Sequence, residues 1–216
     1  MLVLGLGNPE KEYQDNRHNT GKQFLDFLDQ NNELNWQKRK DLLCFLAKKD
    51  DLYLAKSLTY MNDSGQAAQA LVKKLKVKLN NFYLAHDELD LKLGEYKISF
   101  GKSSALHKGV LSVERELKSK DFWRVRIGVD NRDSENRIAG ERYVLQDFRS
   151  EEEKKLKKVF EEIIVSLRGY CHPERSRRIF PKIPRSRSCG TQDDYLNCHS
   201  ERSPATAGRS RGIFEN

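Results

Sequence analysis

The chain has 216 residues, with 40 Lys and Arg against 32 Asp and Glu, a formal net charge of +8 and a sequence pI of about 9.2. This length allows one substantial hydrophobic core, and the basic excess favours a polyanionic partner, although a solvated lysine-rich surface explains the charge equally well. No apolar run approaches the ~20 residues of a membrane helix and no signal-peptide pattern opens the chain, so we expect a cytoplasmic protein without membrane contact.

The chain opens on an apolar strand. Residues 2–6 alternate aliphatic residues with glycine and end in turn formers, which predicts a buried strand that feeds a loop carrying Asn8 and His18. The segment Gly5-Leu6-Gly7 is typical of dinucleotide sites, but those sites need a third small residue where this chain has Glu10. We therefore expect no nicotinamide or flavin cofactor.

Helices and strands alternate along the residues that follow. Apolar spacing predicts helices over residues 20–31, 67–75, 110–117 and 150–167, and strands over residues 42–47, 52–56, 82–85, 95–100 and 123–129. The strand of residues 82–85 runs into the acidic cluster His86-Asp87-Glu88-Leu89-Asp90, and the last strand carries Arg124 and Arg126 on one charged face. This order predicts an α/β fold, a three-layer α/β/α globule with a mixed, mostly parallel central sheet.

The composition changes near Gly169, after which Arg, Ser, Pro and Gly replace the aliphatic residues. We predict a folded domain over residues 1–169 and a basic, disordered tail over residues 170–216. A Cys-His-x-Glu-Arg-Ser segment occurs twice in the tail, but two polar units cannot form a solenoid and adjacent Cys-His pairs lack zinc-site spacing. The functional alternative for the tail is an arginine-rich RNA-binding arm.

Polar side chains in the loops suit the hydrolysis of an activated bond. Each has a structural explanation when taken singly, as a turn former, a helix-start residue or a packing histidine. Together they provide an imidazole that deprotonates water, a carboxylate that orients it, and amides that hold the water and the developing oxyanion. These residues are His18, Asp87, Asn8, Asn62 and His107.

Four motifs stand in unbroken order over residues 1–168. They are Gly5-Leu6-Gly7-Asn8-Pro9 with Tyr13 and Arg17-His18-Asn19-x-Gly21, Thr59-Tyr60-Met61-Asn62-x-Ser64-Gly65, Ala85-His86-Asp87-Glu88-Leu89-Asp90, and Arg124-Val125-Arg126-Ile127-Gly128. Together they closely resemble bacterial-type peptidyl-tRNA hydrolase. The resemblance implies a monomeric α/β enzyme that cleaves the ester between a peptide and the terminal ribose of tRNA, recycling tRNA from stalled translation without metal or cofactor.

The resemblance also implies roles for individual residues. His18 is the general base and Asp87 assists it, while Lys97 and Arg126 clamp the terminal phosphate of the tRNA. The amides position substrate and water, and Met61 lines the peptide-binding cleft. The expected substrate-binding residues are Asn8, Tyr13, Met61, Asn62, His107 and Lys108.

The chain departs from the family pattern at several positions. Lys108 stands where the family has an asparagine, Glu10 replaces a glycine, and the loop of residues 101–109 has lost glycines. After Leu167 the tail replaces the family's C-terminal segment. Two alternatives therefore stay open: a catalytically weakened or inactive RNA-binding relative, and a decaying gene product whose tail compromises folding.

Overall fold

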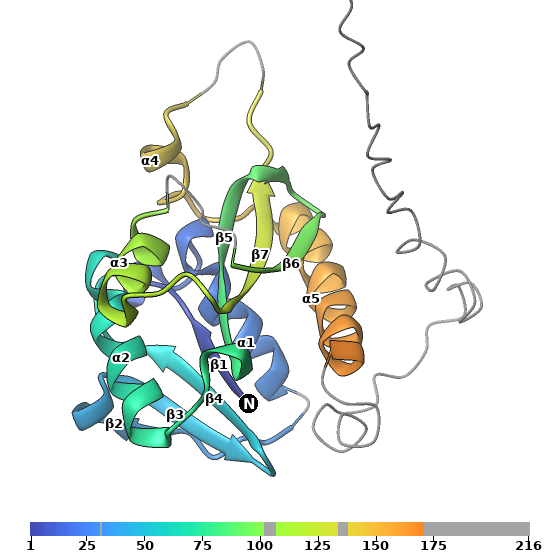
Figure 1. The fold of residues 1–216 in the computed structure, drawn as a ribbon. Coiled ribbons are helices and arrows are strands. Elements are labelled where there is room, and N and C mark those ends of the chain that lie inside the picture. The colour runs from blue at the N-terminus through green and yellow to red at the C-terminus, as the bar shows by residue number, and fades with distance from the viewer. Residues whose placement is uncertain (31, 102–106, 134–137, 171–216) are drawn as a thin grey trace, which may run out of the picture. The chain divides into compact units, whose positions relative to one another are not determined.

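A computed structural model describes residues 1–30, 32–101, 107–133 and 138–170, and the predicted tail lies outside these residues except for Tyr170. Within them the strands form one seven-stranded sheet in the order β2-β3-β4-β1-β5-β7-β6 (Figure 1). The strands are β1 (Leu2–Gly5), β2 (Gln37–Arg39), β3 (Cys44–Lys49), β4 (Leu52–Ser57), β5 (Phe82–Lys92), β6 (Tyr96–Phe100) and β7 (Trp123–Asp130). The helices are α1 (Thr20–Gln30), α2 (Ser64–Leu75), α3 (Lys108–Leu117), α4 (Gly140–Tyr143) and α5 (Ser150–Tyr170), and the 3-10 turns are η1 (Lys11–Tyr13), η2 (Arg17–Asn19), η3 (Lys40–Leu42), η4 (Met61–Asp63) and η5 (Leu79–Asn81).

The predicted mixed sheet is confirmed. Strands β4, β1, β5 and β7 pair in parallel, whereas β2 with β3, β3 with β4, and β6 with β7 pair antiparallel. Parallel pairing places the carboxyl ends of β1, β5 and β7 at the same edge of the sheet. The loops after β1 and β4, which carry Asn8, His18 and Asn62, therefore meet at that edge, whereas Asp87 lies on β5 itself.

Two helix layers cover the sheet. Helices α1 and α5 pack against each other through Phe24 and Phe160, whose ring centroids lie 5.4 Å apart. Helices α2 and α3 pack closely on the other face, where the amide of Gly65 donates to the Ser112 hydroxyl at 3.1 Å. The core between this pair and the sheet contains the fully buried Leu2, Leu4 and Leu6 from β1 and the loop after it. In the described part of the chain, no helix combines the length and apolarity needed to cross a membrane.

Two glycines bring helix α1 unusually close to the sheet. A Cβ atom on Gly5 would lie 2.4 Å from the carbonyl oxygen of Gly21, and one on Gly21 would lie 2.2 Å from that of Ala85. Both separations are far shorter than any van der Waals contact, so larger residues would push the helix away. Gly5 thus serves the packing of a helix, and this approach brings the segment before α1 next to Ala85 of β5.

The structure differs from the sequence prediction at three places. Strand β5 does not end at Ala85 but continues through the acidic cluster to Lys92. Arg124 is not on an exposed face, because its side chain is fully buried and donates to Glu114 at 2.7 Å. The polar edge strand β2 and the short helix α4 lack an apolar periodicity and were not predicted.

Candidate active site

Three side chains meet at the carboxyl edge of the sheet, and we call them the histidine cluster: His18, Asp87 and His107. Nδ1 of His18 lies 3.0 Å from each carboxylate oxygen of Asp87, and Nε2 of His107 lies 2.8 Å from Asp87 Oδ1. They come from η2, from β5 and from the residue before α3. Asp87 and His107 are buried, while His18 keeps 15% of its side chain exposed. The cluster therefore has one member that solvent or substrate can reach.

The hydrogen bonds determine which nitrogen of each ring carries a proton. His107 is the N-cap residue of α3, and its Nδ1 accepts from the amide of Val110 at 3.3 Å. A neutral His107 must then carry its proton on Nε2 and donate it to Asp87. A carboxylate only accepts, so His18 likewise donates through Nδ1. This leaves Nε2 of His18 as the nitrogen with a free lone pair.

The cluster shifts the pKa values of its members. Burial lowers the pKa of His18, but the charge of Asp87 and its hydrogen bond outweigh burial and raise the pKa above 6.5, while the charge of Lys108 acts to lower it. Burial acts to raise the pKa of Asp87, but the two facing histidines hold it well below its usual range. Asp87 is therefore ionised at neutral pH, as a residue that orients and stabilises a base must be.

His86 does not share this role. It is fully buried, its Nδ1 donates to the carbonyl of Asp87 at 2.7 Å, and its ring packs edge-on against His107. Burial and the neighbouring His107 lower the pKa of His86 to about 3. The side chain stays neutral at physiological pH, which agrees with its interpretation as a packing histidine.

The histidine cluster is also a group whose ligand atoms could hold a metal ion, since they all lie within 4.8 Å of one another. The separations of 2.8 and 3.0 Å are those of hydrogen bonds. Both inward nitrogens and the carboxylate are thus already used in pairing with one another. A metal would have to displace these bonds and the proton on each ring.

Asn8 is held rigidly beside the cluster. Its side-chain oxygen accepts from the amide of Met61 at 3.0 Å, and its own amide donates to Asn19 Oδ1 at 2.8 Å. Its carbonyl accepts from Asn19 Nδ2 and from Lys22 Nζ, at 3.1 and 2.7 Å. With Oδ1 occupied, the side chain of Asn8 offers its NH₂ group as a donor. Asn19 and Lys22 were not among the predicted site residues, although Asn19 directly follows His18.

The remaining predicted substrate-binding residues lie at different depths. Met61 is buried, and its sulfur lies so close to Gly109 that a Cβ there would be 2.3 Å away. Met61 therefore packs against the first turn of α3, next to His107. Asn62 is exposed on η4 and Tyr13 is half-buried on η1, and the described residues provide no hydrogen-bond partner for the Asn62 side chain. Their roles in binding stay predictions.

Lys108 lies at the start of α3, directly after His107. Its ammonium pairs with Glu141 of α4 at 2.7 Å, and both side chains are largely exposed, at 61% and 79%. Such a pair contributes little to stability because water screens it. The lysine therefore places a positive charge near His18 on a side chain that is free to move.

Lys97 and Arg126 are direct neighbours across strands β6 and β7, and we call them the basic pair. Lys97 is exposed, whereas Arg126 is partly buried and its Nε donates to Glu88 at 2.8 Å. Glu88, which was not predicted, directly follows Asp87 and so connects the two clusters along β5. The structure thus brings together the two cations predicted to bind phosphate.

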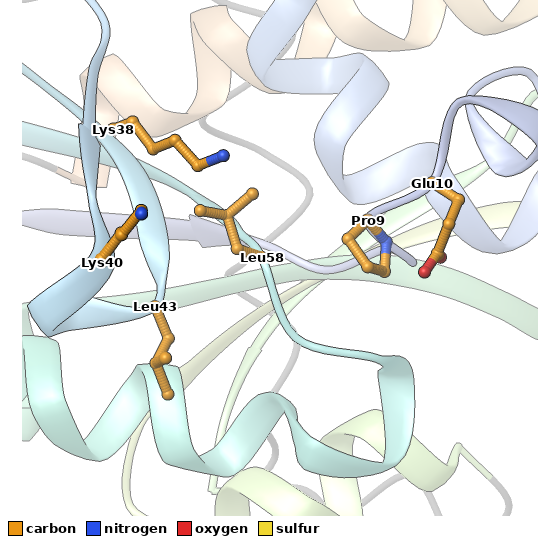
Figure 2. A pocket seen from close by; sticks show the side chains of 6 residues that line it. All are labelled: Pro9, Glu10, Lys38, Lys40, Leu43 and Leu58. Atoms are coloured by element: carbon orange, nitrogen blue, oxygen red, sulfur yellow. The ribbon is translucent and has the colours of Figure 1, made fainter.

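A hollow of about 440 Å³ opens beside the loop that carries Asn8. Figure 2 shows Pro9 and Glu10 facing the segment that carries Lys38, Lys40 and Leu43, with Leu58 between them. The carboxylate of Glu10 accepts a hydrogen bond from the hydroxyl of Tyr60, next to Met61. The family-atypical Glu10 therefore braces two loops of the site.

Comparisons with known proteins agree with this geometry. A family model described as peptidyl-tRNA hydrolase matches residues 2–182. The chain is 38% identical over 137 residues to the peptidyl-tRNA hydrolase of Coxiella burnetii, covering 63% of this chain and 73% of that protein. It is 37% identical over 170 residues to that of Pelagibacter ubique, covering 77% and 90%. The crystal structure of peptidyl-tRNA hydrolase from Acinetobacter baumannii matches with a TM-score of 0.70 and 26% identity, over 85% of this chain and 96% of the other.

Proposed function

The chain belongs to the peptidyl-tRNA hydrolase family, and from this we propose that it hydrolyses the ester bond between peptide and tRNA in peptidyl-tRNA, with His18 as the general base. The observation that carries the proposal is the orientation of His18. Asp87 binds Nδ1 on the inner side, so the partly exposed ring presents Nε2 to a water molecule. An intact base of this kind favours turnover over RNA binding alone.

In the reaction, Nε2 of His18 takes a proton from water as the oxygen attacks the ester carbonyl carbon. The negative charge of Asp87 stabilises the imidazolium that forms. The carbonyl oxygen becomes an oxyanion, which the NH₂ groups of Asn8 and Asn62 stabilise. When the tetrahedral intermediate collapses, the bond to the ribose oxygen breaks and His18 returns the proton to that oxygen. The products are a free peptide and a tRNA with a free terminal ribose.

The proposed reaction needs no metal or cofactor. A ribose ester is labile, and positioning combined with general-base help, worth about a hundredfold or more, is sufficient for useful turnover. His107 supports the base by donating to the same carboxylate oxygen as His18. It fixes Asp87 and leaves the proton transfer to His18.

The tRNA lies across the carboxyl edge of the sheet in this proposal. The basic pair clamps a phosphate near the terminal ribose, which holds the ester at a set distance from His18. Asn8, Tyr13, Met61 and Asn62 bind the peptide side of the substrate in this proposal. Lys108 and His107 stand between the two sides, at the start of α3.

The protein acts in this proposal as a cytoplasmic monomer that rescues tRNA from stalled translation. Residues 1–169 form the catalytic domain, which contains every proposed site residue. The basic tail of residues 170–216 has no part in the reaction in this proposal.

An ester-release assay tests the proposed function. Purified protein is mixed with N-acylated aminoacyl-tRNA, and released tRNA is separated from the intact ester. We expect catalytic turnover by the natural chain and none by His18→Ala, while both bind the tRNA. Salt-sensitive binding by the natural chain without any release would refute the enzyme and support the RNA-binding alternative.

A further inference from the structure

Arg17, the residue before the base, is one of the most thoroughly anchored side chains of the described domain. It is buried, and its Nη1 donates to the carbonyl of Gln146 at 3.1 Å and to that of Asp147 at 2.5 Å. Its guanidinium lies over the rings of Tyr143 and Phe148, 4.4 and 4.9 Å from their centroids. One arginine thus contacts α4 and three consecutive residues, 146–148, of the segment that connects α4 to α5.

Glu152, in the first turn of α5, is the charged partner of Arg17. Nη2 of Arg17 donates to Glu152 Oε2 at 2.6 Å, and only 5% and 8% of the two side chains are exposed. Glu152 also accepts from Asn131 at the end of β7 and from the amide of Arg149, at 3.1 and 2.8 Å. The carboxylate of Glu152 therefore connects Arg17, the residue before His18, to both the sheet and helix α5.

The segment between α4 and α5 also binds the backbone of His18. The amide of His18 donates to the carbonyl of Val144 at 2.8 Å, and that of Arg17 donates to the carbonyl of Gln146 at 3.0 Å. Val144 and Gln146 thus bind the main chain of η2. The side chain of Arg17 binds the carbonyls of residues 146–147 in turn, and Glu152 binds that side chain. Movement of this segment would turn His18 relative to Asp87.

Stability alone does not explain a buried ion pair at this place, because desolvation offsets much of the attraction. The described domain contains a second pair of the same kind, Arg124 with Glu114, at 2.7 Å and with 0% and 7% exposed. That pair joins β7 to α3 and makes no hydrogen bond to residues 17–19. The two pairs therefore differ mainly in the segments that they connect.

We propose that Arg17 and Glu152 are positioning residues for the reaction, which together fix the backbone of His18 so that its ring meets Asp87 through Nδ1. The inference rests on the proposed function of His18. The orientation of the His18 ring then depends on the ion pair between Arg17 and Glu152 in the first turn of α5, more than 130 residues away in the chain.

The direct readout is the ionisation of His18. The titratable and charged groups that face it are Asp87 from β5, His107 before α3 and Lys108 at the start of α3. A ring that loses its fixed position against Asp87 loses the interaction that raises its pKa. Burial and Lys108 remain, and both lower it.

The experiment compares Glu152→Gln with Glu114→Gln, two isosteric changes at equally buried ion pairs. NMR titration of labelled histidine, with the His18 signal identified by its loss in His18→Gln, gives the His18 pKa, and ester release gives kcat and KM. We expect Glu152→Gln to lower the His18 pKa and to reduce kcat about 10- to 100-fold with KM little changed. Glu114→Gln should leave the His18 pKa and kcat as in the natural chain.

Arg17→Lys provides a second arm, since a single ammonium cannot hold two carbonyls and a carboxylate in one plane. It should lower the His18 pKa and kcat in the same direction as Glu152→Gln. An unchanged His18 pKa in both variants, or an equal effect of Glu114→Gln, would overturn the positioning proposal. Full activity of His18→Ala would instead refute the proposed function, and the NMR result separates the two failures because it requires no substrate.

Discussion

The histidine cluster and the basic pair lie at the same edge of one sheet but are built in opposite ways. In the histidine cluster every inward atom is hydrogen-bonded and two of three side chains are buried. In the basic pair Lys97 is exposed and Arg126 keeps one ion-pair partner, Glu88. The first arrangement fixes one lone pair in space, which suits chemistry, and the second offers charge to a mobile anion, which suits binding. Mutations in the histidine cluster should therefore change kcat, and mutations in the basic pair should change KM.

Asp87→Asn should cause the largest effect after loss of His18 itself. An amide can donate to Nδ1 and so favours the wrong tautomer, and it does not stabilise the imidazolium, so kcat should fall by about 10²–10⁴-fold. Since Asp87 raises the pKa of His18, the residual activity should persist to lower pH than in the natural chain. A pH–rate profile measures both. A small loss, or an acid limb that moves to higher pH, would contradict the role of Asp87.

Arg126→Ala should raise KM about tenfold and leave kcat nearly unchanged, because one phosphate contact is lost and the base is untouched. The salt dependence of tRNA binding should become shallower by about one unit of logarithmic slope. Lys73→Ala, an equal loss of charge on the exposed face of α2, is the control and should change neither. A fall of kcat at constant KM would show that the basic pair contributes to the chemical step and not only to tRNA binding.

Lys108→Asn tests the residue that lies between the two sides of the site. Restoring the family's asparagine should raise kcat by an amount equivalent to one hydrogen bond, about 0.5–1.5 kcal/mol. The lost positive charge should also raise the pKa of His18 and move the acid limb to higher pH. Stability should hardly change, because the pair with Glu141 is exposed. An unchanged or lower rate would mean that the loop around residue 108 has found another solution and does not need the family's asparagine.

The smallest effect is expected from a chain that ends at Tyr170. Both clusters and the core described here lie before that residue, so ester release and the midpoint of thermal unfolding should stay close to those of the full chain, within about 0.5 kcal/mol. Calorimetry of the two chains checks this. A broad or much lower transition in the shorter chain would show that residues 171–216 belong to the folded domain.

Sequence reasoning predicted the central elements because their apolar spacing is regular. It did not predict that β5 continues past Ala85, because His86, Asp87 and Glu88 are polar and their partners lie far away in sequence. The apparent alternation of β7 likewise concealed the burial of Arg124, which depends on Glu114 from another element. Tertiary partners override local patterns at these places.

The candidate site shows the same limit. Motifs identified His18, Asp87 and Arg126 as individual residues, and the family resemblance added Lys97, whereas their distances and tautomers depend on the fold. Glu152 illustrates what was missed: it is the middle residue of three consecutive glutamates, and only the structure shows that its carboxylate accepts from the amide of Arg149. Its bond to Arg17 spans 135 positions, which no local pattern reveals.

The central claim is that neutral His18, held by Asp87, takes the proton from water. The most direct test measures kcat/KM for ester release from pH 5 to 9 and the pKa of His18 by NMR in the same protein. The raised pKa of His18 predicts that activity falls as pH decreases through a value above 6.5, with an apparent pKa equal to that of the His18 ring. The same ion pair should stabilise the fold at pH values below 6.5 and cease to do so as pH rises through the His18 pKa. Activity that continues undiminished while His18 becomes fully protonated would contradict the account.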